Sequence, residues 1–307
     1  MKAMRIHEFG GPDVLQLEET PRPTPASDDV LIKVYASGVN PVDWKVRNGA
    51  GRYHAHLPLT LGWDVSGVIE EIGRNVKEFR KGDEVYGRPD LSRDGTYAEY
   101  VVVKAAQISL KPKSIDHEKA AAVPLAGLTA WQGLFDHGKL QPGQKVLIHG
   151  ASGGVGSYAV QFAKWKGAYV IGTTSESNIN LVKKLGADEV IDYKNEKFEE
   201  MLKDIDLVFD TIGGDTQRRS LLVLKKGGRL ITTVKPEFQE QAKDKRIYLE
   251  GYMAQSYPEQ LKQIAELIDA GKVKPVISKV LPLEQAAEAQ KLSEKGHVTG
   301  KIVLQVV

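Results

Sequence analysis

A glycine-rich segment at residues 150–156 has the residue types and the spacing that bind a phosphate group. It reads Gly-Ala-Ser-Gly-Gly-Val-Gly and joins an apolar run, 145–149, to a stretch with helical spacing, 157–164. A strand, a glycine turn and a helix in this order leave unpaired backbone N–H groups at the helix N-terminus, where the helix dipole adds partial positive charge. The segment therefore predicts a dinucleotide pyrophosphate site, although a plain glycine turn has the same composition. The residues predicted to bind the cofactor here are Ser152, Gly153, Gly154 and Val155.

The end of the next predicted strand, residues 169–173, bears on which dinucleotide binds. An NAD site usually places Asp or Glu there to accept a hydrogen bond from the ribose 2′-hydroxyl. Thr174 occupies this position, so no carboxylate repels a 2′-phosphate. Ser175, Asn178 and Tyr193 could donate hydrogen bonds to that phosphate. The pattern favours NADP.

Glu176 complicates the choice between NADP and NAD, because it follows Thr174 by two residues and could face the ribose. The alternative is a solvent-facing residue at a helix start, where the helix dipole favours an acid. A Lys or Arg that could clamp the 2′-phosphate is not adjacent, since the nearest cations in the following helix are Lys183 and Lys184.

Alternating strands and helices after residue 120 position these groups. Helices are expected at 154–167 and 177–185. Such alternation implies right-handed crossovers and a parallel sheet covered on both faces. Six strands match a doubly wound, Rossmann-type nucleotide-binding fold. The expected strands are 146–149, 169–173, 189–192, 207–210, 229–233 and 247–252.

The first 110 or so residues instead predict short strands and tight turns, typical of an antiparallel, barrel-like domain. Residues 257–270 form a predicted amphipathic helix, and 276–307 return to strand, helix and strand and pack on the first domain. We therefore expect an α/β protein of two domains. The expected domains are 1–120 with 272–307 for the substrate and 121–271 for the dinucleotide.

Composition narrows the functional classes. The chain has 307 residues, 41% hydrophobic and 27% charged, with 42 Lys and Arg against 40 Asp and Glu. This balance predicts a small-molecule substrate and neither a nucleic acid nor a membrane as partner. The chain has no cysteine, which excludes disulfides, cysteine-ligated zinc, Fe–S clusters and a thiolate nucleophile. No secretory signal or membrane span is visible, so we expect a cytoplasmic enzyme.

The chain resembles the medium-chain dehydrogenase/reductase superfamily, in its zinc-free, quinone oxidoreductase-like (zeta-crystallin-like) branch. The resemblance implies a GroES-like β-barrel catalytic domain, a Rossmann domain and an active site in the cleft between them. It runs nearly end to end. The motifs that carry it, besides the glycine loop, lie at 36–43, 58–73, 79–87, 122–130 and 299–304.

Differences from the zinc-bearing members of this family indicate whether this chain binds a metal ion. Those members have cysteine where this chain has Asn40, Gly-His-Glu where it has Gly62-Trp63-Asp64, and a third ligand cysteine near Leu125. Zn²⁺ binds thiolate, imidazole and carboxylate groups, which asparagine, tryptophan and leucine do not provide. We expect no metal. His54 and His56 could form a metal pair, but no supporting carboxylate cluster is evident.

The resemblance also implies residues on the nicotinamide side of the cofactor. Asn40 and Thr129 resemble residues that touch the nicotinamide and its ribose, and Met253 follows the sixth strand and could approach the carboxamide. Two of these have plain structural alternatives. Thr129 could bond its own helix backbone, and a Met is often simply part of a core.

Without zinc, hydrogen-bond donors must polarise the substrate, or the substrate must be intrinsically electrophilic. Tyr53, Asn40 and Lys45 are the candidate donors, and Tyr53 lies in a loop where the family forms its cleft wall. We assign Tyr53 and Asn40 as the catalytic candidates; a packed or exposed loop tyrosine is the alternative for Tyr53. Asp43 is expected to brace the turn after Asn40, and His149 to make a structural hydrogen bond.

These inferences predict a metal-independent, NADPH-dependent reductase of quinones or α,β-unsaturated carbonyl compounds that acts by hydride transfer. The alternative from another class is a non-catalytic NADPH-binding sensor or interaction protein. A 2-enoyl thioester substrate is a third possibility, without an evident basic patch for the carrier. Family members often dimerise through the Rossmann edge strand, so the resemblance implies a homodimer through residues 246–252.

Overall fold

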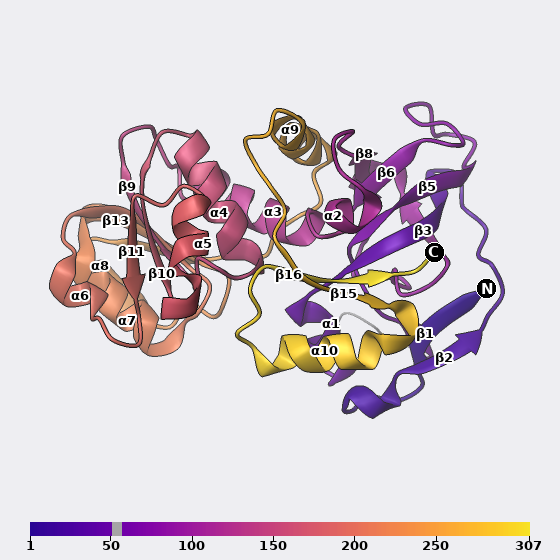
Figure 1. Cartoon of the computed structure of the whole chain (residues 1–307), viewed down its shortest axis with the longest axis horizontal. Helices are drawn as coiled ribbons and strands as arrows, with labels where there is room; N and C mark the ends of the chain where they lie inside the picture. The colour runs from indigo at the N-terminus through magenta and orange to yellow at the C-terminus, as the bar shows by residue number, and fades with distance from the viewer. Residues whose placement is uncertain (51–56) are drawn as a thin grey trace. The chain divides into compact units, whose positions relative to one another are not determined.

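The computed structural model describes residues 1–50 and 57–307, so Tyr53, His54 and His56 lie outside the described residues. The chain forms two compact units. Unit 1 comprises Met1–Leu125, Ser256–Gly271 and Pro275–Val307, and unit 2 comprises Ala126–Gln255 and Lys272–Lys274. Figure 1 labels the helices and strands of both.

Unit 2 is built on a parallel sheet whose strand order is β11-β10-β9-β12-β13-β14 in the part of the chain that the structure describes. This order, with the first strand central, is that of the doubly wound dinucleotide-binding fold, as the strand–helix alternation predicts. Every expected strand is present within a few residues. The strands are β9 (Lys145–His149), β10 (Tyr169–Thr174), β11 (Glu189–Asp192), β12 (Ile205–Asp210), β13 (Leu224–Thr232) and β14 (Tyr248–Gly251).

Helices cover this sheet and bury its apolar strands. Leu147, Val208 and Leu230 from three adjacent strands are fully buried in one cluster of the core. Helix α3 (Pro124–Trp131) continues directly into a π-helical turn, Gln132–His137. The remaining helical segments of the unit are α4 (Gly154–Trp165), η4 (Glu176–Asn178), α5 (Ile179–Lys184), α6 (Phe198–Met201), α7 (Gly214–Val223) and α8 (Gln239–Asp244).

Unit 1 contains two sheets in the described part of the chain. A small one has the order β2-β1-β4, and the larger follows β15-β16-β3-β5-β6-β8 with β7 also on β3. All pairs are antiparallel except β15 with β16. The strands are β1 (Lys2–Ile6), β2 (Gln16–Glu19), β3 (Asp29–Val39), β4 (Leu59–Thr60), β5 (Val65–Ile72), β6 (Glu84–Gly87), β7 (Tyr100–Lys104), β8 (Ile108–Leu110), β15 (Ile277–Pro282) and β16 (Lys301–Gln305).

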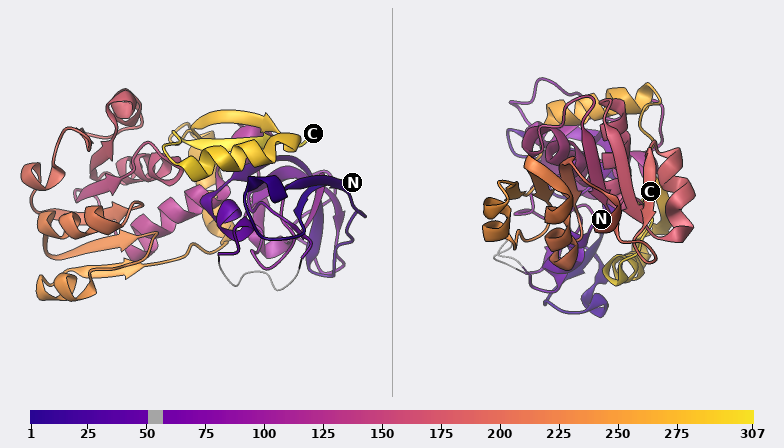
Figure 2. Two further views of the ribbon diagram at one scale, coloured as in Figure 1. Left: turned by 90° about the horizontal axis from the view of Figure 1, so that it is seen from below. Right: turned by 90° about the vertical axis from the view of Figure 1, so that its left-hand side faces the viewer.

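The long strand β3 organises unit 1, because it pairs with β5, β7 and β16. Its pairing with β5 carries register shifts at Leu31/Ile32 and Val34/Ala36, which locally bend the strand. Its other edge pairs first with β7 and then with β16. Figure 2 shows α10 lying along β15 and β16. Strand β16 pairs with β3 and α10 contacts α1, so the C-terminal segment packs on the N-terminal part of unit 1. The helices of the unit are α1 (Pro41–Arg47), α2 (His117–Ala121), α9 (Pro258–Asp269) and α10 (Ala286–Lys295), and its 3₁₀ turns are Pro12–Val14, Ala105–Gln107 and Leu283–Gln285.

Helix α9 departs from the expected division at residue 271, because it belongs to unit 1. Its buried face includes Leu261 and Ile264. The Tyr86 hydroxyl donates to the Leu261 carbonyl oxygen over 2.5 Å, and the Asp269 carboxylate accepts the backbone N–H of Ser114 over 2.8 Å. These bonds, together with packing on β8, attach the helix to the barrel-like unit.

Candidate functional site

The glycine loop has the geometry that its sequence predicts. Gly150 has a φ of 68°, a left-handed conformation that suits glycine, and the chain turns there directly after β9. The Gly153 N–H donates to the Gly150 carbonyl oxygen (2.9 Å), and the Ala151 N–H donates to the Thr173 carbonyl oxygen (3.0 Å). Helix α4 then begins at Gly154 with Gly153 as N-cap and no side-chain cap. The first N–H groups of a 12-residue helix therefore remain available to an anion.

Two glycines shape this cradle in different ways. A Cβ on Gly156 would overlap the Gly150 carbonyl oxygen and lie 2.8 Å from the Ala151 Cα, so only glycine lets α4 approach the loop so closely. A Cβ on Gly153 would meet only the Gly150 carbonyl oxygen, at 3.3 Å, among atoms of the described residues. The cradle therefore fits a pyrophosphate, which would fill space that a side chain at Gly153 would otherwise enter.

The end of β10 lies beside the loop, and Thr174 connects the two. Its hydroxyl donates to the Ser152 Oγ over 2.8 Å, and the residue is only 2% exposed. Thr174 therefore holds the loop in place, while Ser152 keeps a hydroxyl hydrogen with which to donate to a ligand.

Ser175, Asn178 and Tyr193 gather at the same sheet edge. The Asn178 Nδ2 donates to the Ser175 Oγ over 3.4 Å, and the Tyr193 N–H donates to the Thr174 carbonyl oxygen over 3.1 Å. The Tyr193 side chain is 46% exposed. These three predicted contacts with the 2′-phosphate therefore lie together, at the carboxyl ends of β10 and β11.

Charges around this strand end are mixed. Glu176 is exposed at the first position of η4, directly after Ser175. Lys194, next to Tyr193 after β11, is also exposed and was missed by sequence reasoning. Its position one residue beyond a predicted contact could have identified it.

Ile212 is a second residue that sequence reasoning missed. It is 56% exposed, follows the end of β12, and its Cδ1 lies 3.3 Å from a Cβ built on Gly150. Strand β12 neighbours β9, opposite β10, so Ile212 stands where the strand order reverses and where such folds bind their ligand. An exposed apolar side chain at this place can cover one face of a nucleotide.

His149, at the end of β9, has a structural role. Its Nδ1 lies 3.0 Å from the Thr173 Oγ1 and its Nε2 lies 2.9 Å from the Ser220 Oγ. The Ser220 hydroxyl donates to the Thr216 carbonyl oxygen, so we assign the imidazole hydrogen to Nε2. Burial lowers the pKa of His149 to about 4, and the neutral ring ties β9 to β10 and α7 as expected.

Thr129 and Met253 lie on a second part of unit 2. The Tyr252 hydroxyl donates to the Thr129 carbonyl oxygen over 2.5 Å, and Gln132 and Gln255 exchange side-chain to backbone hydrogen bonds of 2.8 and 2.9 Å. These bonds hold the end of α3 against the segment after β14. Met253 is 56% exposed there, so it is not part of a core. Burial raises the pKa of Tyr252, which keeps this donor protonated.

In unit 1, the positions compared with zinc ligands meet in one buried polar cluster. The Asn40 Nδ2 donates to the Asp64 Oδ2 over 2.8 Å, and the Leu125 backbone N–H donates to the Asp64 Oδ1 over 2.7 Å. The cation in this cluster is the Lys301 ammonium, which lies 3.4 Å from the Asp64 Oδ2. Burial raises the pKa of Asp64, and Lys301 opposes that shift. We call Asn40, Asp64 and Lys301 the buried triad.

Asp43 braces Asn40, as the sequence predicts. Its Oδ2 accepts the Asn40 N–H over 2.8 Å and the Tyr97 hydroxyl over 2.7 Å, at the first turn of α1. Among the described residues its Oδ1 has no hydrogen-bond partner. Burial raises the pKa of Asp43 to about 7. Neutral Asp43 is therefore populated near neutral pH.

The donor set at the zinc-ligand positions does not fit a metal. Asn40 directs an N–H at Asp64, Trp63 is fully buried, and Leu125 contributes only a backbone N–H. Within residues 1–50 and 57–307, no three His, Cys, Asp or Glu residues lie close enough together to hold a metal ion.

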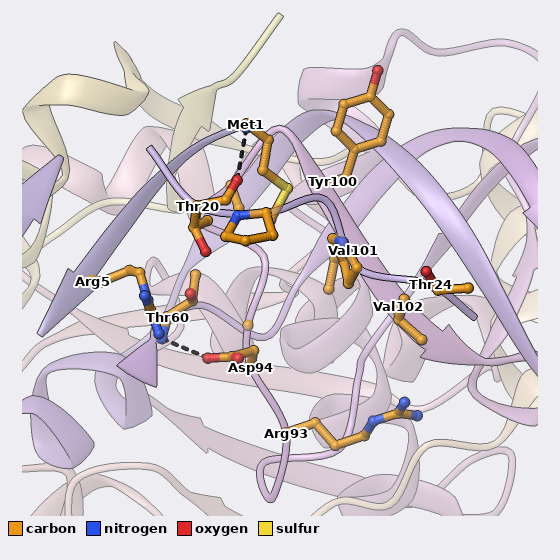
Figure 3. Close-up of a pocket in the computed structure, with 14 residues that line it drawn as sticks. Met1, Arg5, Thr20, Thr24, Thr60, Arg93, Asp94, Tyr100, Val101 and Val102 are labelled. Carbon is orange, nitrogen blue, oxygen red and sulfur yellow. Dashed lines mark hydrogen bonds between the residues drawn. The ribbon is translucent and has the colours of Figure 1, made fainter. Parts of the chain in front are cut away.

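A pocket of about 240 Å³ in unit 1 is lined by none of the predicted site residues (Figure 3). Some of its polar groups are already engaged in hydrogen bonds. Arg93 donates twice to Asp29, at 3.0 and 2.8 Å, and the Thr60 N–H donates to Asp94 over 2.8 Å.

Two family models match this chain. The alcohol dehydrogenase GroES-like domain matches residues 26–113, and the zinc-binding dehydrogenase model matches residues 185–304. No helix in the described part of the chain is long and apolar enough to cross a membrane.

The relatives described next are similar to this chain over nearly its whole length. The mitochondrial NAD(P)H oxidoreductase RTN4IP1 of Mus musculus is 39% identical over 91% of this chain and 82% of its own length. The chloroplastic NADPH-dependent alkenal/one oxidoreductase of Arabidopsis thaliana is 36% identical over 99% and 79%. The structure of the quinone oxidoreductase from Coxiella burnetii has a TM-score of 0.95 and 38% identity, with 100% of this chain and 99% of that chain covered. Two of these names place their proteins in organelles, so a cytoplasmic location remains a prediction for this chain.

Proposed function

The chain belongs to the quinone oxidoreductase-like branch of the medium-chain dehydrogenase/reductase superfamily, and we propose that it is an NADPH-dependent reductase of quinones or α,β-unsaturated carbonyl compounds that needs no metal. The observation that carries the proposal is the uncapped start of α4 behind a glycine cradle, on a doubly wound sheet. This arrangement fits a nicotinamide dinucleotide.

The residues that would hold the cofactor fall into three groups. Ser152 and the backbone N–H groups of Gly154 and Val155 would bind the pyrophosphate. Gly153, whose own N–H donates to the Gly150 carbonyl oxygen, would leave the space for it, and Ile212 would cover the nucleotide on one side. When bound, NADPH supplies a hydride to the substrate. The groups proposed for the 2′-phosphate are Ser175, Asn178, Tyr193 and Lys194, and those proposed for the nicotinamide side are Thr129, Met253 and Asn40.

NADP is proposed over NAD because the position of the ribose-binding acid is occupied by the buried Thr174. Lys194 adds a cation at the same sheet edge, whereas Glu176 opposes it. The name of the Arabidopsis relative, an NADPH-dependent oxidoreductase, supports the same choice.

Quinones and enones are proposed as substrates because the chain offers hydrogen bonds rather than a Lewis acid at the zinc-ligand positions. These compounds accept a hydride at carbon while their oxygen takes up negative charge, which a single donor can stabilise. The names of the Arabidopsis and Coxiella proteins, an alkenal/one and a quinone oxidoreductase, support this class. Asn40 is the proposed donor in the described part of the chain, and Tyr53 remains a proposed second donor.

The test is the oxidation of NADPH and of NADH by the purified protein with 1,4-benzoquinone and with a 2-alkenal. We expect turnover with at least one of the two acceptors and a preference for NADPH. NADPH binding without turnover on either acceptor would contradict the enzyme and favour the non-catalytic NADPH-binding protein. A clear preference for NADH would contradict the cofactor assignment.

We further propose a homodimer formed through β14. This strand ends the sheet in the part of the chain that the structure describes, and an edge strand carries backbone groups that can pair across a two-fold axis. Tyr248 is an exposed aromatic side chain on it. The expected result is twice the chain mass in light scattering after size exclusion.

A further inference from the structure

The buried triad in unit 1 joins segments that are distant in the sequence. Asn40 follows β3 directly, and Lys301 begins β16. The antiparallel register pairs Ile302 with Val39, so its continuation by one residue brings Lys301 opposite Asn40. Asp64 precedes β5, which pairs with β3 on its other side. The sheet itself therefore places the ammonium, the carboxamide and the carboxylate together.

Lys301 is almost completely buried, at 4% exposed, and each of its ammonium hydrogens has an acceptor. The Nζ lies 3.0 Å from the Val39 carbonyl oxygen, 2.5 Å from the Asn40 Oδ1 and 3.4 Å from the Asp64 Oδ2. The ammonium therefore has no hydrogen left with which to bind another ligand. Its effect on any chemistry must pass through Asn40 or Asp64.

The two charges fix the orientation of the Asn40 carboxamide. The Oδ1 faces the ammonium, and the Nδ2 faces the carboxylate over 2.8 Å. A half-turn of the amide would set its NH₂ group against the ammonium and its oxygen against the carboxylate. It would replace two charge-assisted hydrogen bonds by two repulsions, so one orientation is strongly favoured.

We propose that Lys301 is a positioning residue for the reductase: it holds Asn40 so that the second Nδ2 hydrogen, which Asp64 does not use, donates to the substrate oxygen. The inference rests on the proposed function. Hydride adds to a substrate carbon, the electron pair moves to the oxygen, Asn40 stabilises the resulting anion, and solvent supplies the proton. The ammonium on Oδ1 also draws electron density from the amide, which strengthens the N–H donor.

The kinetic test combines Lys301→Met with Asn40→Ala. We expect Lys301→Met to lower kcat by roughly 10- to 100-fold, because a misplaced catalytic group has losses of that order. The KM for NADPH should change little. In the Asn40→Ala background, Lys301→Met should lower kcat no further, because its effect passes through Asn40. An unchanged kcat in the single variant, or an equal further loss in the Asn40→Ala background, would overturn the inference.

Two further variants separate positioning from folding. Lys279→Met is the matched control, because Lys279 is exposed on β15 and pairs with Ile302; its kcat should equal that of the wild type. Lys301→Met leaves the Asp64 carboxylate buried without its cation and could prevent folding. The double variant Asp64→Asn with Lys301→Met removes both charges together, and the same loss of kcat is expected from it if it folds with normal NADPH binding.

A measurement that needs no turnover keeps this inference separate from the proposed function. In protein labelled with ¹⁵N-asparagine, the Asn40 side-chain hydrogens, assigned with Asn40→Ala, should give two distinct signals that exchange slowly with water. Lys301→Met should abolish that protection, and Lys279→Met should retain it. Protection that survives Lys301→Met would refute the positioning role. A wild type without turnover but with this signature would refute only the proposed reductase.

Discussion

The substitution Asp43→Asn should make the stability of the protein less sensitive to pH. The Asp43 carboxyl accepts from the Asn40 N–H and the Tyr97 hydroxyl through one oxygen, and the other oxygen is buried without a partner among the described residues. Burial raises the pKa of Asp43 from 3.8 to about 7, so ionised Asp43 destabilises the folded state. An asparagine side chain keeps an acceptor for both hydrogen bonds and removes the ionisation.

The sign and size of this pH dependence of the unfolding free energy follow from proton linkage. The folded pKa is raised, so the folded protein binds the proton more tightly than the unfolded chain does. The resulting stability is fully present below the unfolded pKa and is lost as pH rises through the folded one. A shift of this size corresponds to about 4 kcal/mol in total. Between pH 5 and pH 8, the wild type should lose roughly 2.5 kcal/mol of unfolding free energy through this group alone.

The assay is urea denaturation of wild type and Asp43→Asn at pH 5 and pH 8. The contributions of all other titrating groups cancel when the unfolding free energy of the wild type is subtracted from that of the variant. This difference should be roughly 2.5 kcal/mol more favourable to the variant at pH 8 than at pH 5. Asp13→Asn, at an exposed position in unit 1, is the control and should show no such change. A difference between wild type and Asp43→Asn that is the same at both pH values would refute the reasoning.

Three further variants test the dinucleotide-binding unit. Gly156→Ala should weaken NADPH binding at least tenfold in fluorescence titration and lower Tm, because the new Cβ meets backbone atoms and overpacking costs about 1–3 kcal/mol. The control Gly11→Ala, where a Cβ meets no atom, should change neither. Glu176→Lys should lower the KM for NADPH roughly three- to tenfold, an effect that shrinks with added salt, and an equal change for NADH would contradict this. Tyr248→Lys should give the monomer mass in light scattering, while Tyr169→Lys, on the interior strand β10, should leave the dimer intact.

The dinucleotide-binding unit was predictable because its determinants are local. The run before Gly150, the turn and the helical spacing after Gly154 lie within 20 or so residues, and the alternation of strands and helices after residue 120 implies a parallel sheet. The short strands and tight turns of the first 110 or so residues predicted a barrel-like domain, and the family resemblance added that this domain is GroES-like.

Other features depend on contacts that sequence periodicity does not encode. The spacing of Leu261 and Ile264 indicates that α9 has a buried face but not which unit covers it. At Thr174 the sequence indicates only the absence of an acid, whereas the side chain donates to Ser152. The motif containing Lys301 is recognisable, but its pairing with Asn40 spans 261 residues and depends on strand register. Tyr53 lies outside the described residues, so its catalytic role stays a prediction.

The discontinuity of unit 1 has a consequence for biosynthesis. Asp64 and Lys301 are 237 residues apart, and the whole of unit 2 is translated between them. At about 5–20 residues per second, roughly 10–50 s pass between the synthesis of Asp64 and that of Lys301. During that time the nascent barrel lacks β16 and holds an uncompensated acid, which favours protonated or open forms and access for chaperones. The dinucleotide-binding unit, in contrast, is fully translated before the barrel can close.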